Sequence, residues 1–492
     1  CIIGAGAAGI TLARELASTS AKIALFESGG LDYEQATQEL NEGTVAGVPY
    51  TPLVMDRLRF FGGTTNHWSG GCRPLEASDF ADWPFGRDTL LPYYRRAQPI
   101  CQLGPFTYDA KDWATDAARP APFAAGSSLR QGIIQYSPPT RFGQVYRDDL
   151  KTARNVAVHL HANLVDIDTD GEGVAAMRLQ TLEGKSFRAR AKRYVLAAGG
   201  IENARILLNA QGGRGVGNGG DMVGRCFMDH AEVPKAAQIV FTAPRPVLAF
   251  WDDHPVRGTN VQGFVAIDPA LRQREGLPPL AFGFEAGAPV DDLGRESLRQ
   301  IYESLRAGHI PDHLGFAVSQ VLDAIEFKAE AAYDRVLHRE PTVYSTFFSC
   351  GSPPDPASRV TLDDKRGALG LRRARLDWRL PKDFEAKMAA AHEVLGRELG
   401  AAGLGRLRIN SAANGHDPMQ GLGNGHHEMG TTRMHADPRH GVVDADGRVH
   451  GLGNFFIAGS SVFPSYGADN PTITIVALAL RLADRLKMEL SA

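Results

Sequence analysis

Short apolar runs at the start of the chain alternate with a small-residue turn and a helical pattern. An apolar strand over 1–3 is followed by a helix over 10–17 and a second apolar strand over 22–26. Glu27 comes directly after that second strand, where its carboxylate can accept hydrogen bonds from ribose hydroxyls. This order of strand, turn, helix, strand and acid predicts a βαβ unit that binds a nucleotide with an unphosphorylated ribose.

The turn between the first strand and its helix has the spacing G-x-G-x-x-G. Gly4 permits the tight turn, Gly6 lets the backbone approach a pyrophosphate, and Gly9 lets the helix pack on the strand. Ala7 and Ala8 open the helix, whose N-terminal amides and dipole attract phosphate. The turn is therefore predicted to hold a dinucleotide.

Two later segments of the chain show apolar patterns that fit the same domain as this βαβ unit, which predicts an α/β fold. Strand-like alternation after residue 226 mixes with helices near 296–335 and 382–402. We expect a Rossmann-like domain built from both chain ends, with a substrate-binding domain of sheet and helices inserted into it. The expected boundaries are 1–90, 150–225 and 425–492 for the first domain, 91–149 for a connecting segment, and 226–424 for the inserted domain.

Two further segments favour FAD over NAD as the dinucleotide. A strand over 193–198 ends in small residues at Ala198, which allows chain to pass close to a flavin nucleotide. A strand over 156–165 brings the backbone of Leu164 to a plausible adenine contact. A second G-x-G-x-x-G with a spaced acid is lacking, which argues against a separate NAD(P)H domain.

A glycine-rich loop over 62–73 combines hydroxyl, amide and aromatic side chains. Such a loop can lie against a planar ligand and donate hydrogen bonds to its edge. A surface loop with one buried Trp anchor is the alternative. The side chains expected beside an isoalloxazine ring are those of Asn66, His67 and Ser69.

His427 lies three residues before Gly430 and is the candidate general base. A neutral imidazole can take an alcohol proton as hydride leaves the carbon. Composition alone does not choose it over His426, His435, His440 or His450, and these histidines have poor spacing for a zinc site.

Asn470 precedes Pro471 and Thr472 at the start of the last apolar helix. Asn caps helices well and Pro suits the first turn, so a purely structural role is complete in itself. The alternative is that the Asn470 amide binds the substrate oxygen while the helix N-terminus stabilises negative charge on the reduced flavin.

Composition sets the broad class of the protein. The chain has 492 residues, a net charge of −3 and five cysteines without any C-x-x-C spacing. We therefore expect no nucleic-acid partner, no membrane span, no metal site and a reducing, cytoplasmic compartment. The chain starts inside a strand without Met, so a missing upstream segment, including a removed signal peptide, stays open.

These features together resemble the glucose–methanol–choline (GMC) oxidoreductases. The resemblance rests on the N-terminal glycines, the loop over 62–68, the segment 198–201, His427 with the segment 430–434, and the segment 443–472. It implies the GMC fold and FAD-dependent oxidation of an alcohol to a carbonyl, with hydride passing to flavin N5, His427 as base and Asn470 as its partner. The cofactor contacts that it implies are Gly4, Gly6, Ala7, Ala8, Gly9, Glu27, Gly62, Gly63, Thr64, Asn66, His67, Trp68, Ser69, Leu164, Ala198, Gly459, Ser460, Pro471 and Thr472.

Within that family the loop and Asn470 are most similar to pyranose oxidases and bacterial sugar or glycoside oxidoreductases. A sugar or glycoside hydroxyl is therefore the expected substrate, with oxygen, a quinone or a redox partner as electron acceptor. In pyranose oxidases the loop His can carry FAD covalently, which corresponds to His67, although Asn66 stands where that pattern has Thr. The alternatives are a dehydrogenase of a non-sugar alcohol that uses a partner, a GMC-type hydroxynitrile lyase, and an NAD(P)H-dependent flavoprotein.

Overall fold

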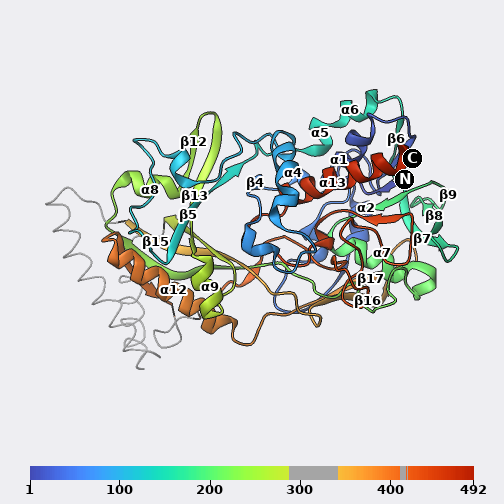
Figure 1. The fold of residues 1–492 in the computed structure, drawn as a ribbon. Helices are drawn as coiled ribbons and strands as arrows, with labels where there is room; N and C mark the ends of the chain where they lie inside the picture. Colours follow the sequence, from blue (N-terminus) through green and yellow to red (C-terminus); the bar gives the residue numbers. More distant parts are fainter. Residues whose placement is uncertain (287–341, 411–416, 418, 492) are drawn as a thin grey trace.

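The computed structural model describes residues 1–286, 342–410, 417 and 419–491, which form two adjoining lobes (Figure 1). Both chain termini lie in the same lobe. The helices expected near 296–335 fall outside the described residues, whereas the helix expected near 382–402 is confirmed as α12 (Phe384–Ala401).

A parallel sheet forms the centre of the lobe that holds the termini. Within the described residues its strand order is β20-β10-β1-β2-β6, and every neighbouring pair is parallel. The strands are β1 (Ile2–Ile3), β2 (Ile23–Phe26), β6 (Val156–His159), β10 (Tyr194–Leu196) and β20 (Phe455–Ile457). The sheet thus joins three distant parts of the chain, which confirms the expectation that both ends build one Rossmann-like unit.

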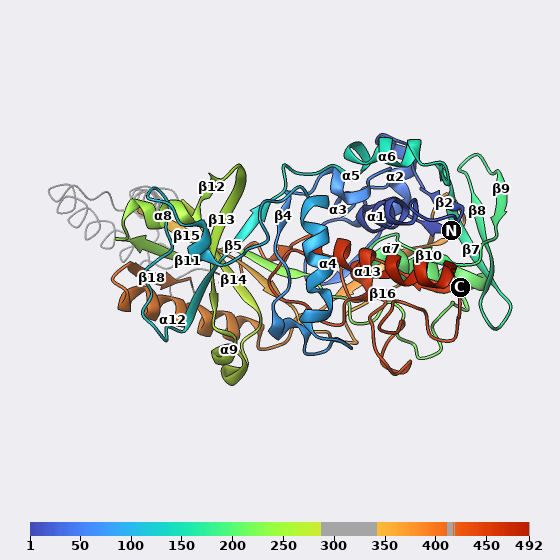
Figure 2. The ribbon, with the colours of Figure 1, turned by 45° about the horizontal axis from the view of Figure 1, so that its top comes forward.

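Helices cover this sheet and bring the two ends of the chain into contact. The first helix, α1 (Ala7–Leu16), packs against the last, α13 (Thr472–Ser491), and α13 also packs against α4 (Arg87–Ile100). Figures 1 and 2 both show α13 running beside α1 and crossed by α4. The α4–α13 contact includes a buried hydrogen bond of 2.9 Å between the hydroxyls of Tyr94 and Thr474.

An antiparallel sheet dominates the other lobe. Its main path in the described residues is β18-β11-β15-β14-β13-β5-β4, with β12 beside β13 and β19 beside β11. The strands are β4 (Gly71–Cys72), β5 (Leu129–Tyr136), β11 (His230–Phe241), β12 (Asp253–Val256), β13 (Thr259–Ile267), β14 (Leu280–Ala286), β15 (Thr342–Gly351), β18 (Gly405–Ile409) and β19 (Gly423–Asn424). The segment 91–149, expected as a connection, therefore supplies β5, which pairs with β13 along its whole length.

Smaller elements complete the described chain. One additional sheet contains β3 (Gly43–Gly47), β16 (Arg359–Arg366) and β17 (Arg372–Trp378), and another contains β7 (Asn163–Thr169), β8 (Val174–Gln180) and β9 (Ser186–Ala189). The remaining α-helices are α2 (Gln35–Gln38), α3 (Leu53–Asp56), α5 (Phe142–Val145), α6 (Arg147–Thr152), α7 (Gly200–Gly213), α8 (Arg245–Trp251) and α9 (Pro269–Glu275). Among the described residues, none of the helices is both long and apolar enough to cross a membrane.

Candidate active site

A cavity of about 640 Å³ lies at the carboxyl ends of the parallel strands β1, β2 and β10. This volume is in the range of cofactor and ligand pockets. Its walls come from both ends of the chain and include residues 3–8, 26–28, 63–65, 67–69, 162–164, 197–200, 425–428, 459–460 and 470–472. The first strand–helix turn, the glycine-rich loop and the C-terminal histidines therefore share one cavity.

The strand–helix turn brings open backbone to the cavity wall. Gly4 has a φ of +100°, and a Cβ atom there would lie 2.5 Å from the carbonyl oxygen of Ala197. A Cβ on Gly9 would lie 1.9 Å from the carbonyl oxygen of Gly4, so the helix packs on the strand as predicted. By contrast, a Cβ on Gly6 would meet nothing within 4 Å, because this backbone faces the cavity.

Glu27 lines the same cavity and also fixes the turn. Its Oε2 accepts a hydrogen bond of 2.8 Å from the backbone N–H of Ala5, and its Oε1 accepts one of 3.1 Å from Gly29. Burial raises the pKa of this carboxyl, while these two backbone bonds oppose the shift. The side chain is thus held in place at the position predicted for ribose recognition.

Internal hydrogen bonds hold the glycine-rich loop in shape. The amide of Asn66 donates to the carbonyl oxygens of Phe61 and Gly63 at 3.1 and 3.0 Å, so this side chain does not line the cavity. The indole N–H of Trp68 donates to the Thr140 carbonyl at 2.9 Å. His67 lies on the cavity wall, and partial burial lowers its pKa.

His427 and Asn470 meet on the cavity wall. The His427 Nε2 and the Asn470 Nδ2 are 3.4 Å apart, and both residues line the cavity. Burial lowers the pKa of His427 well below its ordinary value, and the neighbouring His230 and His426 add to that shift. The imidazole is therefore neutral at neutral pH and able to accept a proton.

A second histidine, His230, lies behind His427. The two Nδ1 atoms are 2.6 Å apart, and the His230 Nε2 is 3.0 Å from the carbonyl oxygen of Gly467. The preceding residue, Asp229, accepts hydrogen bonds of 2.9 and 2.7 Å from the backbone N–H groups of His427 and His230. Burial raises the pKa of Asp229 to about 7.

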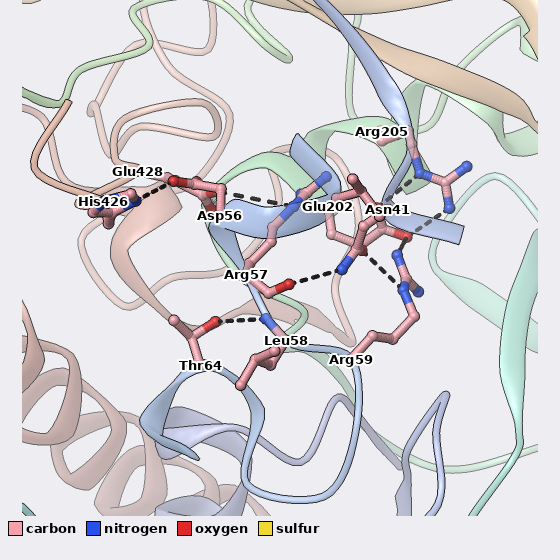
Figure 3. A network of polar contacts seen from close by, with 12 residues as sticks. Asn41, Asp56, Arg57, Leu58, Arg59, Thr64, Glu202, Arg205, His426 and Glu428 are labelled. Atoms are coloured by element: carbon pink, nitrogen blue, oxygen red, sulfur yellow. Dashed lines mark hydrogen bonds and ion pairs between the residues drawn. The ribbon is translucent and has the colours of Figure 1, made fainter. Parts of the chain in front are cut away.

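Two more buried acids lie next to this pair of histidines. Asp56 is hydrogen-bonded to His426 and to Glu428 (Figure 3). Burial raises the pKa of Glu428 well above its ordinary value, and the nearby Arg57 opposes that shift. Burial acts in the same direction on Asp56, but its hydrogen bonds to His426 and Glu428 hold its pKa below the ordinary value.

Arg57 brings a cation without hydrogen-bond partners among the described residues to the cavity wall. The residue is 7% exposed, and its three guanidinium nitrogens have no hydrogen-bond partner among the described residues. Its nearest acid is Glu428, with 3.9 Å between Nε and Oε1. Figure 3 shows Arg57 between this acid and a second group in which Glu202 bonds Arg59 and Arg205. Buried polar groups are almost always hydrogen-bonded, so Arg57 indicates a ligand with anionic or strongly accepting oxygens.

Comparison with known proteins identifies the family to which this cavity belongs. The family model of the GMC oxidoreductases matches residues 354–479. The C-terminal part of the chain is thus that of a GMC oxidoreductase. The described fold agrees, since the chain superimposes on pyridoxine 4-oxidase from Mesorbium loti with a TM-score of 0.61, 18% identity and 98% coverage of both chains. As a GMC oxidoreductase it is an FAD-dependent enzyme that acts on CH–OH groups.

Named GMC relatives match almost the whole chain at low identity. One is the 6'''-hydroxyparomomycin C oxidase of Streptomyces lividus, which is 26% identical. The alignment covers 100% of this chain and 92% of that protein. The fructose dehydrogenase large subunit of Gluconobacter japonicus is 23% identical, with 91% of this chain and 84% of that protein aligned.

The residues of the cavity fit FAD by three independent features. These are the open backbone at Gly6, the anchored carboxylate of Glu27 and the guanidinium of Arg57, which lacks a hydrogen-bond partner among the described residues. The predicted cofactor residues that line the cavity are Gly4, Gly6, Ala7, Ala8, Glu27, Gly63, Thr64, His67, Trp68, Ser69, Leu164, Ala198, Gly459, Ser460, Pro471 and Thr472, whereas Gly9, Gly62 and Asn66 do not line it.

Sequence reasoning missed several groups around His427. No motif or regular spacing in the sequence marks Arg57, Asp56 or Glu428, because each is a charged residue in a loop or at a helix end. His230 lies behind His427 and does not line the cavity.

Proposed function

We propose that this GMC oxidoreductase oxidises a hydroxyl group of a sugar or glycoside to the carbonyl, with His427 as the base. The observation that carries the proposal is the pair of nitrogen atoms, His427 Nε2 and Asn470 Nδ2, 3.4 Å apart on one cavity wall. One is a neutral acceptor and the other an amide donor. A substrate oxygen lying against both would lose its proton to His427 and receive a hydrogen bond from Asn470.

FAD, when bound, supplies the acceptor for the hydride that leaves the carbinol carbon. The role of His427 is to remove the hydroxyl proton at Nε2, which makes loss of hydride from the same carbon easier. The role of Asn470 is to stabilise the developing negative charge on that oxygen with its N–H group.

The cofactor contacts remain part of the proposal. Residues at the Gly4–Gly9 turn and the Arg57 guanidinium would hold the diphosphate, Glu27 the ribose, and the 63–69 loop the isoalloxazine ring. We propose that FAD is held without a covalent bond, because Asn66 precedes His67 where the covalent pattern has Thr. Acid precipitation tests this point, since flavin that stays with the pellet would indicate attachment to protein.

The substrate class rests on the relatives. The aligned proteins include a fructose dehydrogenase subunit and two enzymes named for aminoglycoside oxidation, the 6'''-hydroxyparomomycin C oxidase and the paromamine 6'-oxidase of Streptomyces fradiae. A cavity with many polar groups suits a polyhydroxylated ligand. We therefore place sugars and glycosides first among the candidate alcohols.

The experiment that tests the proposal is an anaerobic visible spectrum of the purified holoenzyme with a panel of sugars, glycosides, aminoglycosides and simple alcohols. Bleaching of the flavin band by the sugar classes is expected. Bleaching only by simple alcohols would show that the substrate is a non-sugar alcohol. Bleaching only by NADPH would reject alcohol oxidation. Repeating the productive reaction with oxygen, a quinone or a dye would then identify the electron acceptor.

A further inference from the structure

Only one hydrogen atom can lie between the Nδ1 atoms of His230 and His427. Their Nδ1 atoms are 2.6 Å apart and the two rings are nearly perpendicular, at 88°. A distance this short requires a hydrogen bond, so one Nδ1 donates and the other accepts. Which ring donates determines whether His427 offers a bare nitrogen or an N–H group to the cavity.

The carbonyl of Gly467 settles the direction of this bond. It lies 3.0 Å from the Nε2 of His230 and can only accept, so that nitrogen carries the hydrogen. His230 is 1% exposed, and burial lowers its pKa to about 4, which keeps the ring neutral at neutral pH. A neutral ring with hydrogen on Nε2 has a bare Nδ1, which accepts from the Nδ1–H of His427.

We infer that His230 is a positioning residue that holds His427 in its Nδ1–H form, with the Nε2 lone pair directed into the cavity. The inference rests on the proposed role of His427 as the base. The other neighbour of His427 agrees with it, because the Asn470 Nδ2 that lies 3.4 Å from Nε2 is a donor and requires a bare nitrogen there.

The same line of groups constrains where the proton goes. After Nε2 of His427 takes the hydroxyl proton, its Nδ1–H continues to donate to His230, which stabilises the imidazolium. The line then ends at the Gly467 carbonyl, which cannot take up a proton. His230 therefore orients and stabilises His427 but does not carry the proton away, and the proton returns through the cavity.

Nitrogen NMR of the oxidised holoenzyme, labelled with ¹⁵N in its histidine rings, tests the tautomer without any substrate. The His427→Ala variant identifies the resonances of His427. A bare, pyridine-type Nε2 and a protonated Nδ1 are expected for His427. A protonated Nε2 on His427 would overturn the inference, whatever the enzyme is later found to oxidise.

Substitution of His230 tests its consequence. In His230→Asn, the side-chain Oδ1 occupies a place close to that of Nδ1 and can still accept from His427, whereas His230→Phe keeps an aromatic ring but offers no acceptor. The matched control is His392→Phe, since His392 is a buried histidine of α12, 2% exposed, outside the cavity lining.

The measured quantity is the rate of anaerobic flavin reduction at saturating substrate. His230→Phe is expected to lower it by about 10²-fold, within the loss known when a base histidine adopts the wrong tautomer. His230→Asn should recover most of that rate, and all three variants should keep their FAD. A parental rate in His230→Phe, or equal losses in the Asn and Phe variants, would overturn the inference. A wild-type flavin that no alcohol reduces would instead reject the proposed function.

Discussion

The backbone of Met228 pairs with that of Met429 through two hydrogen bonds of 3.0 and 2.9 Å, one in each direction. Both residues are fully buried. In the sequence, Met228 precedes β11 of the antiparallel sheet and Met429 follows β19. Because this bridge fixes the register of the two segments, Asp229 and His230 lie beside His427. The position of the proposed base is therefore set by backbone pairing as well as by its own side chain.

Replacement of the proposed base should separate chemistry from cofactor binding. His427→Ala is expected to lower the rate of flavin reduction by about 10²- to 10⁴-fold, because it removes the proton acceptor, and to leave the FAD content unchanged. Stopped-flow absorbance under anaerobic conditions measures the rate. The exposed His440 supplies the control, since His440→Ala should behave as the parent. A parental rate in His427→Ala would assign the base to another residue.

The charge of the residue at 470 should matter more than its size. Asn470→Ala removes one donor to the substrate oxygen and should lower the reduction rate by about 10- to 10³-fold. Asn470→Asp keeps the shape but places a carboxylate where negative charge develops, so its loss should be larger still. Both variants are compared with the parent in reduction rate and in substrate affinity. An Asp variant faster than the Ala variant would contradict a stabilising role for the amide.

Removal of the Arg57 guanidinium should weaken cofactor binding without weakening the apoprotein. Arg57→Met is expected to raise the dissociation constant for FAD by about 10- to 10²-fold, the worth of hydrogen bonds to a charged group. Titration of the apoprotein with ADP should show the same loss, and titration with adenosine should not, because only ADP carries the diphosphate.

Arg205→Met is the matched control for this substitution. Arg205 bonds Glu202 through two nitrogens, at 2.7 and 2.5 Å, and both side chains are buried. Its removal breaks one of the two buried ion pairs of Glu202, the other being with Arg59, and should destabilise the apoprotein, whereas Arg57→Met should not. Equal thermal stability of the two variants, or an unchanged affinity of Arg57→Met for ADP, would contradict this role for Arg57.

The buried carboxyl of Asp229 should make stability depend on pH in a definite direction. Its pKa is about 7 in the folded protein, because burial and the nearby Asp56 raise it, and an unfolded Asp titrates near pH 3.8. The folded state binds the extra proton between these values, so the stabilisation from this carboxyl is full below about pH 4 and is lost as pH rises through 7, by at most about 1.4 kcal/mol per pH unit. The midpoint of thermal unfolding at pH 5 and pH 8 measures this loss.

Asp229→Asn should reduce the loss, since its amide oxygen still accepts the two backbone N–H groups but does not titrate. Part of the loss should remain, because burial also raises the pKa of Glu232 to about 7. The exposed Asp32 provides the control, and Asp32→Asn should leave the difference between pH 5 and pH 8 as it is in the parent. A parental pH dependence in Asp229→Asn would contradict the assignment.

Local patterns explain which parts of the molecule were predictable. The turn at Gly4 and the helix that starts at Thr472 are specified by neighbouring residues, so sequence spacing reveals them. The strand Leu129–Tyr136 was not recognised, because its pairing with β13 is a contact between remote segments within a polar, proline-rich region. The apposition of His230 and His427 escaped for the same reason, since it depends on the Met228–Met429 bridge and on no local pattern.

The strand order of the parallel sheet also constrains the course of folding. β20 is the edge neighbour of β10, which in turn is the neighbour of β1, so β1 belongs to a sheet whose strand β20 is made hundreds of residues later. α13, which packs on α1, is later still. We expect a nascent chain to present its dinucleotide turn early but to close the flavin cavity only after β20 and α13 have been made, so that cofactor uptake waits for these two elements.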